Sequence, residues 1–199
     1  MSENLFEINF SKYIEPIYKN TLNLKNSIHS CREYIYSGDH KFKISLEDRV
    51  DMTMYETYSI DPVGCKDADD AFSIYKKDDK LYLAIHIADP TDYINIGSDL
   101  WLDIVERTTT KYPSNRNPIH MMPNELMELS SLMVSDSEES KICKAITILS
   151  EINNDFYLCG KVEILFTKIL VKKENALNYN TNQEKSIESI EIGLKISEK

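Results

Sequence analysis

Four aspartates stand within ten residues of this chain: Asp61, Asp67, Asp69 and Asp70. An apolar stretch at 71–74 follows them at once, which is unusual for an acidic segment that simply lies in solvent. If the four side chains converge, two charges ~4 Å apart repel by about 4 kcal/mol at an effective dielectric constant of roughly 20. Such a cluster persists only where protonation or a bound cation neutralises it.

Hard oxygen ligands without a Cys or His ligand pattern suit Mg²⁺ or Mn²⁺, which also bind substrate phosphates. Taken alone, the acidic segment therefore indicates divalent-metal phosphoryl chemistry. The alternative is an acidic surface loop that binds nothing. The residues that follow in the chain favour the metal site.

Composition limits the class of protein. The chain has 199 residues, of which 42% are hydrophobic and 28% charged, as in an ordinary globular protein. No apolar run approaches the roughly 20 residues that span a bilayer, and the N-terminus lacks the order of a secretory signal. The cysteines (Cys31, Cys65, Cys143 and Cys159) lie far apart, without C-x-x-C spacing. This spacing disfavours zinc and disulfides, and predicts reduced thiols in the cytoplasm and no membrane partner.

The net charge of −10 bears on nucleic-acid binding. Phosphate-binding proteins normally carry a basic patch, so an acidic chain binds RNA or DNA weakly by itself. Metal ions can supply the missing positive charge locally.

The hydrophobic pattern predicts a mixed α/β (α+β) fold with an antiparallel-rich sheet and packed helices. Residues 1–48 form a short N-terminal segment to which the pattern assigns no clear structure, and residues 49–199 form the main domain. We expect strands at 57–60, 71–75, 81–88, 144–152 and 156–169, with one hairpin formed by 71–75 and 81–88 and a second by 144–152 and 156–169. A loop is expected at 89–97, and helices at 98–108, from 124 and from 181. Ser98 is the expected N-cap of the first helix, with Leu100, Ile104 and Val105 on one face, and a capping box at 181–184 opens the last helix. Because strand 81–88 is nearly all apolar, we expect it to be buried on both faces.

These residues resemble the RNB catalytic domain of the ribonuclease II / RNase R family of 3′-to-5′ exoribonucleases. The likeness begins at Asp61-Pro62 and continues through Lys66-Asp67-Ala68-Asp69-Asp70-Ala71, His86-Ile87-Ala88-Asp89 and Gly97-Ser98. It continues through Arg107-Thr108 with Tyr112-Pro113, and Met122-Pro123 with Leu126. Order and spacing agree over residues 49–179, which corresponds to the N-terminal part of the family domain.

The resemblance implies specific roles. Asp61, Asp67, Asp69 and Asp70 match the family's metal-binding aspartates, with Asp69 and Asp70 as the catalytic pair and Mg²⁺ or Mn²⁺ as the cofactor. Asp69 matches the residue most critical to hydrolysis. The implied substrate is single-stranded RNA, cut from its 3′ end.

The resemblance also implies a base-stacking residue, because Tyr112 matches an aromatic residue that stacks on the terminal nucleotide. Lys66, Arg107, Lys111 and Arg116 are candidate phosphate contacts, of which Lys66 is the best because it lies inside the motif; the alternative for each is a solvated charge. A half-buried loop tyrosine is the structural alternative for Tyr112. His86, at the end of an apolar strand, is expected to be a core residue and not a ligand.

The departures from the family pattern are as important as the matches. The family's C-terminal half supplies an arginine-rich element, whereas this chain has only Arg32, Arg49, Arg107 and Arg116. Flanking OB-type RNA-binding domains are also absent from the sequence, and Pro90, His120 and Ser130 depart from common family residues. We therefore expect an exoribonuclease that is incomplete alone and needs a second polypeptide with the C-terminal half. The alternatives are a non-catalytic remnant that binds a metal or a partner, and a fragment of a longer product.

Overall fold

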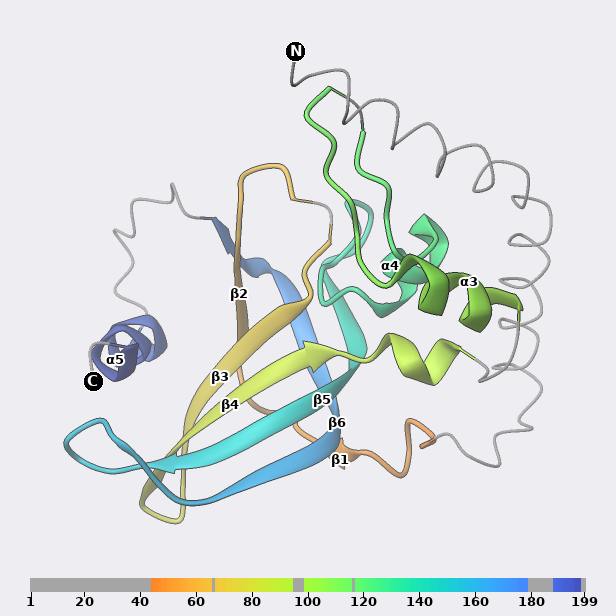
Figure 1. The fold of residues 1–199 in the computed structure, drawn as a ribbon. Coiled ribbons are helices and arrows are strands. Elements are labelled where there is room, and N and C mark those ends of the chain that lie inside the picture. The colour runs from red at the N-terminus through yellow and green to blue at the C-terminus, as the bar shows by residue number, and fades with distance from the viewer. Residues whose placement is uncertain (1–43, 66, 95–98, 116, 179–187, 198–199) are drawn as a thin grey trace. The chain divides into compact units, whose positions relative to one another are not determined.

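The computed structural model describes residues 44–65, 67–94, 99–115, 117–178 and 188–197 (Figure 1). They divide into two compact units: a helical unit within residues 91–127, and a sheet unit made of 44–90 with 128–197. The expectation for residues 1–43 lies outside the described part of the chain.

The elements, in chain order, are β1 (Val50–Asp51), β2 (Thr57–Asp61), β3 (Asp70–Lys77), β4 (Lys80–Ala88), the 3₁₀ helix η1 (Pro90–Tyr93), α3 (Asp99–Arg107), α4 (Asn124–Ser130), β5 (Ser140–Ile152), β6 (Leu158–Asn178) and α5 (Glu188–Ser197). Both predicted hairpins are confirmed, and β5 and β6 are longer than the pattern indicated. The expected loop at 89–97 contains η1.

The sheet has the strand order β1-β6-β2-β3-β4-β5, with a further pairing between β6 and β5. The 21-residue β6 makes this possible: its first part pairs antiparallel with β5, and its last part pairs parallel with β2. The sheet therefore curls back on itself. Small side chains fill the inner face, where Ala71, Ala84 and Ala145 are almost fully buried. This confirms the mixed α/β, antiparallel-rich prediction.

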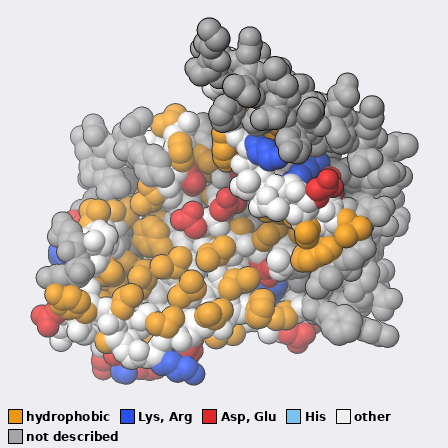
Figure 2. Space-filling view, viewed as in Figure 1, with side chains coloured by type: hydrophobic (Ala, Val, Ile, Leu, Met, Phe, Trp, Pro, Cys, Tyr) orange, Lys and Arg blue, Asp and Glu red, His pale blue; other side chains and the backbone are white. Residues whose placement is uncertain are grey.

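The outer side of β3–β6 is apolar, and we call it the open face. Antiparallel partners share a face of a sheet, so the register defines its rows. Its members are Phe72, Ile74, Leu83, Ile85, Ile87, Ile146, Ile148, Ile164 and Phe166. Figure 2 shows hydrophobic side chains gathered across the sheet, with acidic side chains at the upper margin.

The expected burial of strand 81–88 on both faces is wrong. In β4, Ala84, His86 and Ala88 are buried, whereas Ile85 and Ile87 are 40% and 42% exposed. The physical reason is that β4 packs its inner side into the curled sheet, whereas among the described residues little covers its outer side.

The helical unit has its own small core of Ile94, Leu100, Ile104 and Leu126. The predicted helix is confirmed as α3, although the expected cap residue Ser98 lies outside the described residues. Val105, expected on the same face as Leu100 and Ile104, is 51% exposed, so that detail is wrong. α3 ends where Thr108 takes a positive φ of 61°.

The terminal helix is confirmed as α5, but the capping box expected at 181–184 lies outside the described residues. α5 packs against β3 (Figure 1). Ile190 is buried, and a Cβ placed on Gly193 would lie 3.7 Å from Cδ1 of Ile74. α5 therefore covers one edge of the open face.

Candidate active site

The four aspartates lie in the segment 61–70, which joins β2 to β3 and which we call the acidic loop. Asp61 is the last residue of β2 and Asp70 the first of β3, so these neighbouring antiparallel strands bring both residues to one end of the sheet. The chain turns after Asp61, where the Cys65 N–H donates to the Pro62 carbonyl at 3.0 Å. Gly64 takes a φ of 80° in this turn, a conformation that suits a residue without a Cβ.

The centre of the acidic loop is anchored to the segment after α4. Ala68 is fully buried; its N–H donates to Oγ of Ser131 at 3.0 Å, and its carbonyl accepts from the Leu132 N–H at 2.8 Å. The Asp69 carbonyl accepts from the Ala88 N–H at 2.8 Å. The backbone on both sides of the aspartates is thus held, while the carboxylates of Asp69 and Asp70 are exposed.

Ser131 is itself held in place. Its carbonyl accepts from Nζ of Lys141 at 3.0 Å, and Lys141 also donates to the Glu128 carbonyl at the end of α4. Neither Ser131 nor Lys141 is predicted from the sequence to belong to the site. A small polar residue directly before the inward-facing Leu132 was the available signal, and it is weak because such residues also end helices.

Asp61 lies in an unusual electrostatic environment. Burial raises its pKa, and the charges of Asp70 and Asp69 raise it further, while hydrogen bonds from the Ser59 and Cys65 side chains act in the opposite direction. Its Oδ2 atom is buried and has no hydrogen-bond partner within the described part of the chain. A buried carboxylate oxygen that lacks a donor, in a group that feels the charges of other carboxylates, is suited to a cation.

The donor chemistry fits Mg²⁺ or Mn²⁺, because all four candidates are carboxylates. The side-chain positions are not yet those of a coordination sphere: among the described residues, no group of three or more His, Cys, Asp or Glu side chains is arranged to hold a metal ion. Asp69 and Asp70 are exposed, so their carboxylates have room to turn. The metal set of Asp61, Asp67, Asp69 and Asp70 stays a prediction.

His86 lies in a buried string of polar side chains that crosses the inner face of the sheet. Its Nε2 lies 3.0 Å from Oγ of Ser73, and its Nδ1 lies 2.7 Å from Oγ1 of Thr147. Thr57 extends the string at one end and Thr167 at the other, at 3.1 and 2.6 Å. Burial lowers the pKa of His86 to about 4. The expectation that His86 is a core residue is confirmed.

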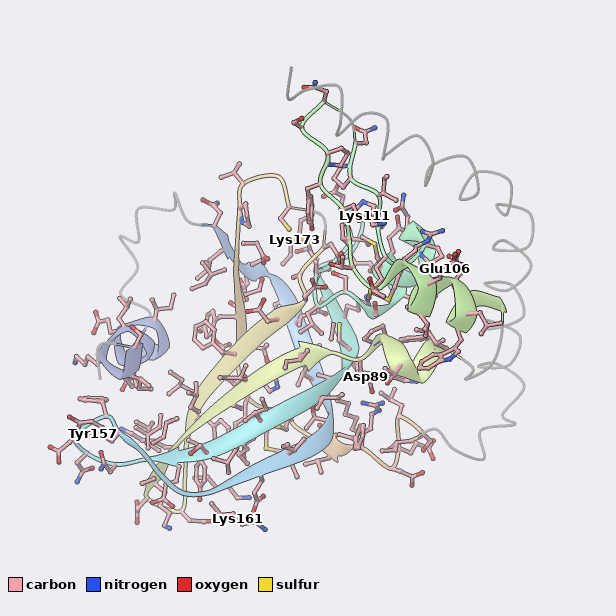
Figure 3. All side chains as sticks on the ribbon, in the orientation of Figure 1. Asp89, Glu106, Lys111, Tyr157, Lys161 and Lys173 are labelled. Atoms are coloured by element: carbon pink, nitrogen blue, oxygen red, sulfur yellow. The ribbon has the colours of Figure 1, made fainter. Side chains whose placement is uncertain are left out.

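Asp89, the last residue of the motif His86-Ile87-Ala88-Asp89, forms a buried ion pair. Figure 3 shows it where β4 ends. Its Oδ2 lies 2.6 Å from Nη2 of Arg49, and both side chains are 1% exposed. Arg49 also donates to the Ala145 carbonyl at 3.2 Å. Arg49 therefore serves the fold of the sheet unit and is not available to RNA.

Arg107 and Tyr112 belong to the helical unit. The Arg107 guanidinium pairs with Asp103 at 2.8 Å and donates to the His120 carbonyl at 2.9 Å. These bonds give it a structural role, and its predicted RNA contact stays a prediction. Tyr112 is 78% exposed, so the half-buried alternative is wrong and its ring is accessible to a base. Lys66 and Arg116 lie outside the described residues.

The motifs agree with those of a known protein family. The family described as RNB domain matches residues 49–189. Exoribonuclease 2 of Photorhabdus laumondii is 39% identical over 106 residues, which is 52% of this chain and 16% of that protein. The chain thus spans about a sixth of the length of this curated relative.

Solved structures agree in fold. RNase R of Mycoplasma genitalium, in complex with ribose-methylated single-stranded RNA, superposes with a TM-score of 0.65 at 20% identity. The match covers 83% of this chain and 27% of that one. Yeast Ssd1, a pseudonuclease, superposes with a TM-score of 0.59 at 16% identity, over 75% of this chain and 19% of Ssd1.

Among the described residues, no helix is long and apolar enough to cross a membrane.

Proposed function

Because the chain belongs to the RNB domain family, we propose that it supplies the carboxylate half of a metal-dependent exoribonuclease. The reaction is hydrolysis of single-stranded RNA from its 3′ end. The observation that carries this proposal is the anchored acidic loop, in which the Asp61 carboxyl has a buried oxygen without a partner among the described residues and is subject to the charges of Asp69 and Asp70. Free thiols at Cys65, Cys143 and Cys159 support a cytoplasmic setting.

The four aspartates form two pairs in this proposal. Asp61 and Asp67, which are partly buried, would hold the cation, and the exposed Asp69 and Asp70 would complete its ligands and orient the attacking water. Mg²⁺ or Mn²⁺, when bound, would stabilise the charge that develops on the phosphate oxygens and make water a better nucleophile. Tyr112 stacks on a base, a contact worth about 1–3 kcal/mol that tolerates any sequence.

The proposal includes a second polypeptide. In the described chain, Arg49 and Arg107 are engaged in ion pairs, so neither is a good candidate to stabilise a scissile phosphate. Losing a single transition-state donor commonly costs about 10²–10³ in rate. We therefore propose that the chain alone is nearly inactive and that a polypeptide with the C-terminal half of an RNB domain restores hydrolysis.

Calorimetry with Mn²⁺ tests the metal site. We expect weak binding that is lost in Asp69→Asn/Asp70→Asn. The matched control is Asp78→Asn/Asp79→Asn, which removes the same charge from the turn at the opposite end of β3 and should bind normally. Equal binding by both double variants would show that the ion is held elsewhere.

A nuclease assay tests the chemistry. The purified chain, 3′-labelled single-stranded RNA and Mg²⁺ should give almost no mononucleotide, and activity should rise when the C-terminal half is added. Asp69→Asn should abolish that activity. Processive degradation by the chain alone would overturn the proposed need for a second polypeptide.

A non-catalytic RNB module is the second candidate, and two observations favour it. No metal-ligating group of three is assembled among the described residues, and a protein of similar fold is a pseudonuclease. This candidate predicts that Mn²⁺ binding, if present, is never accompanied by hydrolysis, even with the C-terminal half supplied. The nuclease assay distinguishes the two.

A further inference from the structure

The last residue of β6, Asn178, lies beside the acidic loop. In the parallel pairing of β2 with β6, Ile60 stands opposite Leu177 and Asp61 stands opposite Asn178 (Figure 1). Paired residues project from the same side of a sheet, and neighbouring strands lie about 4.8 Å apart. The Asn178 side chain is therefore a neighbour of the Asp61 carboxyl, and both residues are partly buried. Neither the acidic motif nor the family resemblance includes Asn178.

An irregularity in β6 sets this register. Ser59 comes two positions after Thr57 on β2, but its partner Ala176 comes five positions after Val171, the partner of Thr57. Three extra residues of β6 are therefore accommodated between these two pairs. Without them, a different side chain would stand opposite the last residue of β2. Irregularities of this kind are common next to functional sites, where they change the direction of a side chain.

The Asp61 carboxyl has one oxygen that receives no donor. The Ser59 and Cys65 side chains hydrogen-bond to this carboxyl. Its Oδ2 atom, by contrast, is buried and accepts no hydrogen bond from any described residue. Asn178 carries two amide N–H donors, yet it does not donate to this atom. An amide carbonyl oxygen and a carboxylate oxygen that lie side by side are a pair of acceptors, which suits a hard cation.

The charge of the acidic loop favours a neutral group as a further ligand. The loop already holds four aspartates, and the charges of Asp70 and Asp69 act on Asp61. A divalent ion carries only two positive charges, so a fifth carboxylate would add repulsion that the ion does not balance. An amide oxygen coordinates a hard cation without adding charge.

We propose that Asn178 is a further ligand of the divalent ion at the acidic loop and binds it through its amide oxygen, next to Asp61. The inference rests on the proposed function, because it requires that this loop holds Mg²⁺ or Mn²⁺. It adds a neutral ligand from β6, a strand far from the aspartates in the sequence. The bound ion would join the end of β6 to the end of β2.

Calorimetry with Mn²⁺ on the full chain tests this assignment through two variants with opposite expected effects. Asn178→Ala removes the amide oxygen and should weaken Mn²⁺ binding by about 10-fold or more. Asn178→Asp replaces the amide by a carboxylate and should tighten Mn²⁺ binding by about 3-fold or more, because cation affinity rises with the charge of the ligands. The same substitution should lower the free energy of unfolding without Mn²⁺, since it adds to the repulsion in the loop.

The matched controls are Asn154→Ala and Asn154→Asp. Asn154 is exposed in the turn that joins β5 to β6, at the other end of the sheet from the acidic loop. Both control variants should bind Mn²⁺ within about two-fold of the unchanged chain, because distant exposed charges are screened. Urea unfolding of every variant, with and without Mn²⁺, shows whether it is folded.

Nuclear magnetic resonance gives a readout that needs no substitution. In the ¹⁵N-labelled chain, substoichiometric Mn²⁺ should broaden the side-chain NH₂ signal of Asn178 and leave that of Asn154 sharp. An Asn178 signal that stays sharp while Mn²⁺ is bound would overturn the proposal, even where a variant at this position does not fold.

The remaining outcomes separate the ligand from the proposed function. Unchanged affinity in both Asn178 variants, or an equal loss in both, would overturn the assignment, because a side chain needed only for folding gives no opposite effects. If Asp69→Asn/Asp70→Asn still abolishes binding, the proposed function stands. Absence of Mn²⁺ binding by the unchanged chain would contradict both. Opposite shifts in the two variants, without hydrolysis in the nuclease assay, would contradict the proposed function and leave the ligand in place.

Discussion

Acidification should destabilise this protein through His86. The side chain is fully buried between Ser73 and Thr147, and burial lowers its pKa to about 4 from 6.5. Between these values the unfolded chain binds a proton that the folded chain does not. Stability therefore rises with pH across this window, is fully present above about pH 6.5, and is lost as the pH falls toward 4.

The magnitude follows from the two pKa values. At about 1.4 kcal/mol for each tenfold change in acidity, the largest loss is about 3 kcal/mol. Lowering the pH from about 7.5 to about 5 should remove about 2 kcal/mol of this. This loss is a large part of the free energy of unfolding, which for a typical domain is about 5–15 kcal/mol.

Urea unfolding at a series of pH values measures the effect. The control is His86→Gln, which replaces the imidazole by an amide that can hydrogen-bond but does not titrate. Contributions from carboxylates are shared by both proteins, so they cancel in the difference. We expect the gap between the two unfolding free energies to change by about 2 kcal/mol over that range. An NMR titration of the His86 ring gives its pKa directly. A ring pKa near 6.5, or parallel pH profiles for the two proteins, would refute the reasoning.

Three further changes test other parts of the structure by urea unfolding. Arg49→Leu leaves the buried Asp89 without its partner and should cost about 3–5 kcal/mol, most of which Arg49→Leu/Asp89→Leu should recover; an additive double variant would contradict this. Ser131→Ala removes the acceptor of the Ala68 N–H and should cost about 1–3 kcal/mol while weakening Mn²⁺ binding, and unchanged binding would separate Ser131 from the site. Asp79→Gly should stabilise the chain by about 0.5 kcal/mol, because Asp79 has a φ of 62° in the β3–β4 turn and glycine adopts this left-handed conformation without strain. A loss of stability would show that the Asp79 side chain contributes more than its backbone conformation costs.

The sequence identified the elements that depend on local pattern. Alternating and apolar runs located both hairpins, and the spacing of Leu100 and Ile104 located α3, because strand and helix periods are properties of the chain itself. The density of carboxylates at Asp61–Asp70 located the candidate site for the same reason. The family motifs added the assignments of individual aspartates, and their roles stay predictions.

Tertiary structure decided which sides of these elements are covered. Neither the pairing of β6 with β2 nor the contact of Ser131 with Ala68 follows from residue spacing, because each joins segments far apart in the chain. The same limit explains the error in β4: apolar residues at Ile85 and Ile87 show that a strand can be covered, not that this chain covers it. Burial depends on what packs against a surface, and a sequence records only one side of that contact.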